Sequence, residues 1–155
     1  MIRIYLVQHG EATAKDIDPE RPLTGKGTKD IEGMARFLGG SGIRVERILH
    51  SGKLRAEQTA RILAGLLPAG TEPERINNIN PNDPVRDFAS GLKKFGSGSM
   101  FVGHLPFMEK LAGYLLSEDE DSRTVEFKPG TVVCLFAPDD ADWKIEWMVR
   151  PELVV

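Results

Sequence analysis

Three basic side chains each follow an apolar run of the sequence. His9 follows the first run, Arg55 comes shortly after the second, and His104 follows a later one. Ligands of open α/β sheets bind at the carboxyl ends of the strands, so these residues are expected to meet around one anion. A neutral imidazole is nucleophilic at physiological pH, since its unperturbed pKa is about 6.5, and a guanidinium holds two phosphate oxygens. The set therefore suits phosphoryl transfer through a covalent histidine intermediate, and a protonated His104 would add charge.

Hydrophobic patterning predicts the elements that hold His9. Residues Ile2–Gln8 are rich in β-branched and aromatic side chains and are followed by Gly10, which indicates a buried strand. A helix is expected after Thr24, and Gly39 and Gly40 should end it. Its apolar positions recur at helical spacing and are Ile31, Met34, Ala35 and Leu38.

The next strand and helix are expected to position Arg55. Residues 45–49 predict a second strand, and the helix after it carries Arg55 in or near its first turn and ends at Pro68. The apolar positions of that helix are Thr59, Ile62, Leu63, Leu66 and Leu67. Residues 71–76 predict a third strand.

The second half of the chain is expected to position His104. Asp83 and Pro84 predict the N-cap and first residue of a third helix. Residues 100–102 predict a buried strand that leads to His104, at the amino end of a helix opened by Pro106. Residues 131–137 and 144–149 then predict a hairpin, with its turn at 138–142, after an acidic loop at 118–121.

These elements together predict one fold class. Strands alternate with helices through the first hundred residues, and two strands close the chain. The pattern predicts a three-layer α/β sandwich, with a mostly parallel central sheet flanked by helices and an antiparallel edge. The length of 155 residues suits a single domain over 1–155.

Composition excludes several classes of partner. The formal net charge of -3 argues against bulk attraction to nucleic acid, so an anion site must be local. No apolar run approaches the length of a membrane span, and no signal-peptide core is present. The single cysteine, Cys134, cannot form an intrachain disulfide and is expected to be a buried small hydrophobe, consistent with a reducing cytoplasm.

Metal and serine chemistry are both disfavoured. The three histidines, His9, His50 and His104, lack the paired spacing of zinc ligands, so no metal site is predicted. Ser51 precedes the second helix and is expected to be a turn or cap residue before it is a nucleophile.

Three segments resemble the histidine phosphatase superfamily, also called the phosphoglycerate mutase-like family. Residues 51–60, SGKLRAEQTA, resemble the family segment Ser-x-x-x-Arg-Ala-x-Gln-Thr-Ala, and Gly103-His104 resembles its second catalytic histidine. Gln8-His9-Gly10 is similar to the Arg-His-Gly signature, with glutamine in place of arginine. The short length and residues 21–27, RPLTGKG, resemble the SixA-like phosphohistidine phosphatases, which lack helical cap insertions.

This resemblance implies roles for particular residues. His9 would be the phosphorylated nucleophile, while Arg55 and His104 would bind phosphoryl oxygens. Gln8, Arg21 and Gly10 would complete the phosphate site. No metal or other cofactor is implied. The implied partner is a phosphohistidine-bearing signalling protein or a small phosphorylated substrate.

Two features depart from the family pattern. Gln8 offers a neutral hydrogen bond where the family has a charged donor, a difference of about 2–4 kcal/mol in transition-state stabilisation, which Arg21 could offset. The general acid is unassigned among Asp83, Asp18 and Glu11. A phosphohistidine needs less acid help than an alkoxide ester, because its leaving imidazole can depart neutral. The alternatives are a small-molecule phosphomonoesterase and a non-catalytic phosphate-binding module.

Overall fold

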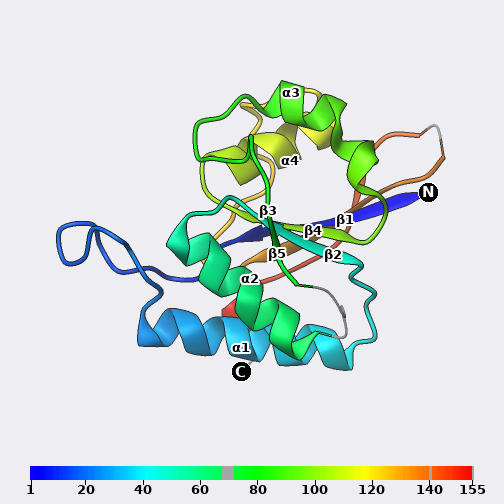
Figure 1. Cartoon of the computed structure of the whole chain (residues 1–155). Coiled ribbons are helices and arrows are strands. Elements are labelled where there is room, and N and C mark those ends of the chain that lie inside the picture. Colours follow the sequence, from blue (N-terminus) through cyan, green and yellow to red (C-terminus); the bar gives the residue numbers. More distant parts are fainter. Residues whose placement is uncertain (68–71, 140, 155) are drawn as a thin grey trace.

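The computed structural model describes residues 1–67, 72–139 and 141–154, and a six-stranded sheet lies at its centre (Figure 1). The strand order is β3-β2-β4-β1-β5-β6. The first four strands in that order run parallel, and β5 is antiparallel to both β1 and β6. The strands are β1 (Ile2–Gln8), β2 (Arg47–His50), β3 (Glu74–Arg75), β4 (Ser99–Gly103), β5 (Val132–Ala137) and β6 (Lys144–Val149).

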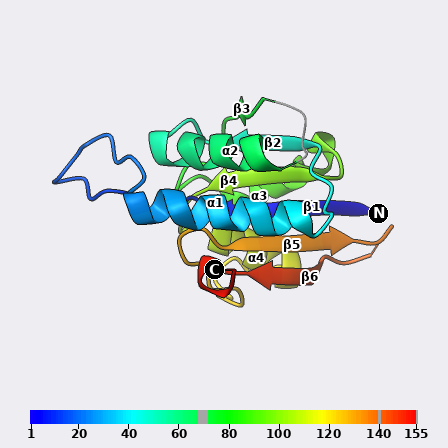
Figure 2. The ribbon, with the colours of Figure 1, turned by 90° about the horizontal axis from the view of Figure 1, so that it is seen from below.

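Helices cover both faces of this sheet. Helices α1 (Gly25–Gly40) and α2 (Leu54–Leu66) lie on one face, and α3 (Val85–Ser90) and α4 (Phe107–Ser117) on the other (Figures 1 and 2). Two short 3-10 helices, η1 (Leu92–Phe95) and η2 (Pro151–Leu153), complete the described elements. The prediction of a three-layer α/β sandwich with a mostly parallel sheet is confirmed.

Side chains on the two faces of β1 pack into two separate hydrophobic cores. Ile4 and Leu6 pack into the core beneath α3 and α4, whereas Tyr5 and Val7 pack into the core beneath α1 and α2. Successive side chains of a strand point to opposite faces, so a strand covered on both faces is apolar throughout. This burial on both faces fixes β1, whose last residue precedes His9.

Most helix and strand boundaries agree with those predicted from the sequence, but the N-cap of α3 does not. The prediction that Asp83 is the N-cap of α3 is wrong: Pro84 is the N-cap, and it makes no side-chain capping bond. The carboxylate of Asp83 accepts instead from the backbone N–H of Asn80 at 2.8 Å, in the preceding turn.

Two other predictions need adjustment, and part of others lies outside the described residues. The second strand is Arg47–His50 rather than 45–49, and the predicted third strand is only Glu74–Arg75. Pro68 and Thr71, and Asp140 of the predicted hairpin turn, lie outside the described residues.

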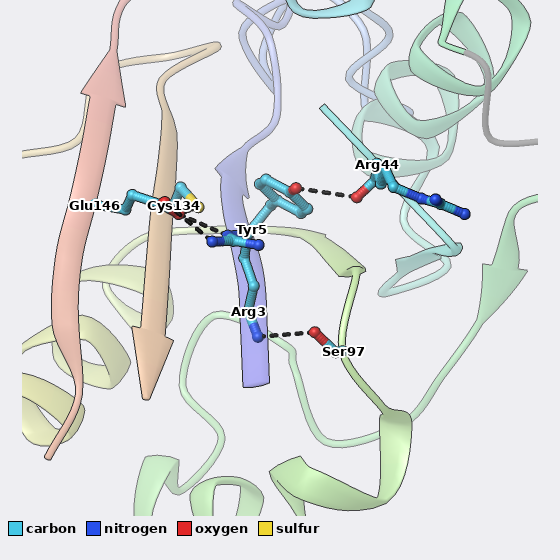
Figure 3. Close-up of polar contacts among 6 residues, drawn as sticks. All are labelled: Arg3, Tyr5, Arg44, Ser97, Cys134 and Glu146. Atoms are coloured by element: carbon cyan, nitrogen blue, oxygen red, sulfur yellow. Dashed lines mark hydrogen bonds and ion pairs between the residues drawn. The ribbon is translucent and has the colours of Figure 1, made fainter. Parts of the chain in front are cut away.

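A polar network ties β1, β5 and β6 together near the amino end of β1 (Figure 3). Arg3 donates to both carboxylate oxygens of Glu146, at 2.6 and 3.0 Å, and the thiol of Cys134 donates to one of them at 3.4 Å. Burial, followed by the contact with Glu146, raises the pKa of Cys134 to about 12. Cys134 is therefore a buried, protonated thiol, as its apolar context predicted.

No helix in the described part of the chain is long and apolar enough to cross a membrane.

Candidate active site

His9 lies at the point where β1 leaves the sheet. Its backbone N–H donates to the carbonyl of Gly103 at 3.0 Å, and Gly130 N–H donates to the carbonyls of Gln8 and His9. These hydrogen bonds hold the backbone of His9 between the end of β4 and the loop before β5. The His9 side chain is 8% exposed, so it is anchored but still reachable from solvent.

The contacts of the His9 ring assign its tautomer. Nδ1 lies 2.7 Å from the carbonyl oxygen of Gly10, which can only accept, so Nδ1 carries the proton. Nε2 accepts from Arg55 Nε at 3.3 Å. Burial lowers the pKa of His9 to about 4, and the charges of Arg55 and Arg21 act in the same direction. At neutral pH the ring is thus uncharged, with its lone pair on Nε2.

His104 faces His9 from the end of β4. Their ring centroids are 5.1 Å apart, and the planes are inclined at 55°. Burial, followed by the nearby His9 and Arg55, lowers the pKa of His104 to about 3, so in the free site it is neutral rather than protonated. The ring Nε2 lies 2.6 Å from Ser51 Oγ, and Nδ1 is buried with no hydrogen-bond partner among the described residues.

Arg55 comes from the first turn of α2 and is joined to the loop after β1. Thr59 Oγ1 accepts from the Gly10 N–H at 3.0 Å and donates to the Arg55 carbonyl at 2.8 Å. Burial, followed by the charge of Arg21, lowers the pKa of Arg55. The structure therefore places His9, Arg55 and His104 together, with Gly10 held against α2.

Arg21 belongs to a loop that projects from the carboxyl edge of β1 (Figure 2). A bridge between Ala12 and Leu23 closes this loop, and Arg21 Nε donates to the Thr13 carbonyl at 3.1 Å. Leu23 N–H donates to Gln58 on α2 at 2.8 Å. The charge of Arg21 lowers the pKa of His9, Arg55 and His104, so this loop residue contributes to the positive potential of the site.

Gln8 is also brought to this place, but its amide is not satisfied. The residue pairs with Gly103 of β4 and is 8% exposed. Its Oε1 is buried and has no hydrogen-bond partner in the described part of the chain. A buried acceptor of this kind is normally paired, so Oε1 is an unsatisfied group of the free protein.

The three candidate acids are occupied elsewhere. Glu11 accepts from the hydroxyl of Thr24 at 2.6 Å, at the start of α1. Asp18 accepts from the N–H of Glu20, and Asp83 from that of Asn80. None of the three hydrogen-bonds to His9 or His104 over residues 1–67, 72–139 and 141–154.

Sequence reasoning missed two members of this site. Ser51 contacts His104, and Thr59 bridges Gly10 and Arg55, although the pattern predicted a turn residue and an apolar helix position. Their place within residues 51–60, beside Arg55, was the one available signal.

The remaining histidine does not complete a metal centre. His50 is buried, and its Nδ1 accepts from the Gly52 N–H at 3.1 Å. The described residues include no group of three or more His, Cys, Asp or Glu side chains placed to hold a metal ion.

Comparisons with known proteins identify similar proteins and similar folds. No family model matches the chain. It is 28% identical over 156 residues to the phosphohistidine phosphatase SixA of Escherichia coli K12, covering 97% of this chain and 94% of that protein. It is also 32% identical over 112 residues to an uncharacterized protein of Picosynechococcus sp., covering 68% and 67%.

Solved structures agree on the fold. The protein histidine phosphatase SixA complexed with tungstate superposes with a TM-score of 0.87 at 22% identity, covering 99% of this chain and 100% of that one. The alpha-ribazole phosphatase of Shigella flexneri superposes with a TM-score of 0.75 at 14% identity, covering 93% and 95%. The chain is thus similar to SixA over nearly the whole length of both proteins, and its fold is that of the histidine phosphatase superfamily.

Proposed function

We propose that this protein is a phosphohistidine phosphatase that works through a phosphorylated His9. The observation that carries the proposal is the state of the His9 ring: Nδ1–H is held by the Gly10 carbonyl, so Nε2 is the unprotonated nitrogen, and its lone pair accepts a hydrogen bond from Arg55 in the free site. The similarity to SixA over 97% of the chain supports a phosphatase activity.

The chemistry proceeds in two displacements. His9 Nε2 attacks phosphorus, and the bond from phosphorus to the substrate imidazole breaks. That imidazole keeps the electron pair, and its other ring nitrogen holds a proton, so it leaves neutral. Water then attacks phosphorus, the bond to Nε2 breaks, and the proton of the water passes to the phosphate released. The Nδ1–H bond to Gly10 stabilises the positive charge that forms on His9 in the intermediate.

The remaining groups bind the phosphoryl oxygens. Arg55 and Arg21 supply positive charge near His9, and His104, whose ring faces that of His9, supplies a ring N–H. A bound phosphoryl dianion favours protonation of His104, whose charged form is disfavoured in the free site. The Gln8 amide and the backbone at Gly10 complete the set.

The three candidate general acids are hydrogen-bonded to other groups, and this favours a phosphoramidate substrate. Loss of an alkoxide needs a proton donor, and Glu11, Asp18 and Asp83 all bond elsewhere in the free protein. An imidazole leaving group removes that requirement. We therefore place phosphohistidine, on a signalling or phosphorelay protein, ahead of small phosphate monoesters.

Rapid-quench trapping with ³²P-labelled phosphohistidine peptide tests the proposal. The wild type is expected to accumulate an acid-labile, alkali-stable phosphoprotein, and His9→Ala to lose both the label and turnover, by roughly 10³-fold or more. His50→Asn is the matched control: it alters a buried histidine with no contact to His9 in the described structure, and should retain both.

Three outcomes would contradict the proposal. Phosphate binding without label or turnover would establish a non-catalytic binding module. Label that survives His9→Ala would move the nucleophile to another residue. Turnover of p-nitrophenyl phosphate ahead of the phosphohistidine peptide would establish a monoesterase.

A further inference from the structure

Two cations beside the site have no carboxylate partner. Six other arginines form ion pairs: Arg3, Arg44, Arg47, Arg61, Arg86 and Arg150. Arg75 and Lys53 are exposed and form no ion pair with any residue that the structure describes. Unlike those arginines, they leave their charge available to a ligand.

Arg75 lies at the same edge of the sheet as the site. It pairs with His50 in the parallel register of β2 and β3, and the next residue donates its N–H to the His50 carbonyl at 2.9 Å. The nearby carboxylates do not neutralise it. Glu74 pairs with Arg47, and Glu57 pairs with Arg61.

The side chain of Arg75 lies across Gly52. A β-carbon at Gly52 would lie 2.5 Å from Arg75 Nε and 2.8 Å from its Cδ, so a larger residue there would displace the arginine side chain from this position. Gly52 also has φ +91, a conformation that other residues rarely adopt. This glycine turn therefore sets the guanidinium beside the loop that leads to Arg55.

Lys53 is the next residue in that loop and is connected to His104. Its backbone N–H donates to Ser51 Oγ at 3.3 Å, and Ser51 Oγ lies 2.6 Å from His104 Nε2. The side chain of Lys53 is also near enough for its charge to act on His104. Lys53 and Arg75 thus flank Gly52 at the rim of the phosphoryl site.

We propose that Lys53 and Arg75 form a carboxylate-binding subsite, which holds an acidic residue beside the phosphohistidine of a protein substrate. This inference rests on the proposed function. The whole chain carries a net charge of -3, so an acidic partner is not attracted by the protein as a whole and must be held locally. The subsite offers two exposed, unneutralised cations, and complementary charge at a rim gives partner specificity.

Peptide binding tests the subsite independently of turnover. Two labelled peptides carry phosphoryl-triazolylalanine, a stable phosphohistidine analogue, flanked by aspartates in one and by asparagines in the other. Fluorescence anisotropy with the full chain at low salt is expected to show about tenfold tighter binding of the aspartate peptide. The variant K53Q/R75Q should reduce that preference to less than about twofold, with the affinity for the asparagine peptide nearly unchanged.

The variant K29Q/R36Q provides the control. It removes two exposed cations from α1 that also lack an ion pair in the described structure, so net charge changes equally, and the preference should persist. Equal binding of the two peptides by the wild type, the same loss in both variants, or binding of neither peptide overturns the subsite. Turnover of matching phosphohistidine peptides is measured in parallel. If the preference is present but turnover is absent, the subsite stands and the proposed hydrolysis fails.

Discussion

Gln8 and His9 are neighbours in the chain, but the hydrogen-bonding groups of their side chains differ in whether they have partners. Both ring nitrogens of His9 have partners, whereas the buried Gln8 Oε1 has none in the described structure. Leaving a buried polar group unpaired costs about 1–3 kcal/mol. Gln8 is therefore, with His104, one of the residues at which the free site is least complete.

Replacing Gln8 by arginine should accelerate phosphoryl transfer. An arginine adds a charge-assisted donor to the developing phosphoryl charge, and a single donor of this kind is worth about 10²–10³ in rate. Because Arg55 and Arg21 already place positive charge beside His9, we expect a smaller gain, of roughly tenfold in kcat/KM for a phosphoramidate. Steady-state kinetics with phosphoramidate or a phosphohistidine peptide measures this gain.

The same crowding of charge should lower the thermal stability of the free Gln8→Arg protein, and added phosphate should restore it. Gln8→Met, which keeps the length of the side chain but removes the amide, is the neutral control and should lose activity. An arginine variant that folds normally but is no faster than the wild type would show that Gln8 does not contact the phosphoryl group.

The sequence predicted which residues meet, but not how they bond. His9, Arg55 and His104 could be brought together from the strand ends, since parallel strands share one carboxyl edge. The contact of Ser51 with His104 joins residues 53 positions apart and leaves no mark on local periodicity. The tautomer of His9 likewise depends on the turn at Gly10, which only the folded backbone shows.

At the scale of elements, the start of α1 is docked directly on the loop that follows His9. Thr24 caps the helix by accepting from the Gly27 N–H at 2.9 Å, and its own N–H donates to the Glu11 carbonyl at 3.0 Å. A β-carbon at Gly27 would overlap that carbonyl oxygen, which is backbone and cannot turn aside. Gly27 therefore allows the close approach of helix and loop.

Gly27→Ala should destabilise the protein even though alanine is the better helix former. Overpacking a close contact costs about 1–3 kcal/mol, which exceeds the gain of about 1 kcal/mol in helix propensity. Gly25→Ala is the matched control in the same helix, because nothing lies within 4 Å of its β-carbon, and its stability should be unchanged or slightly higher. Urea unfolding of both variants measures the difference. Equal free energies of unfolding would mean that the loop moves aside at no cost.

The elements predicted most accurately from the sequence are those whose apolar residues lie along one face or occupy every position. The buried positions of α1 include Ile31, Met34, Ala35 and Leu38, the predicted apolar face, and β1 has the predicted bounds. β3 is different, because Glu74 and Arg75 are both exposed, so no alternation marks its ends. Asp83 was misassigned because an aspartate before proline also suits a turn, and here its carboxylate bonds within that turn.

At the scale of the whole molecule, all three histidines are buried and neutral. Burial is the largest cause in each case: it lowers the pKa of His9 to about 4, that of His104 to about 3, and that of His50 below its usual value of 6.5. An α/β sheet that gathers its site at one edge places His9, His50 and His104 at the carboxyl ends of neighbouring strands, and so concentrates their desolvation there.

This arrangement predicts that the folded protein loses stability as the pH falls below 6.5. Between that pH and the lowered pKa values, the unfolded chain binds protons that the folded protein does not, so the free energy of unfolding decreases with each proton. The loss amounts to at most about 1.4 kcal/mol per histidine for each pH unit, and the stabilisation is fully present above the unfolded pKa. Urea titrations between pH 7.5 and 4.5 measure it, before most carboxylates begin to titrate.

A variant that replaces the two site histidines separates their contribution from the rest. H9N/H104N should show a shallower pH dependence over the same range, and its unfolding at pH 5.5 should take up about two fewer protons. Inorganic phosphate should oppose the effect in the wild type, since a bound dianion favours protonated His104 in the folded state. A pH dependence as steep in the double variant as in the wild type would mean that these histidines are exposed to protons before the protein unfolds, and the neutral His9 on which the proposed attack depends would then not hold at mildly acidic pH.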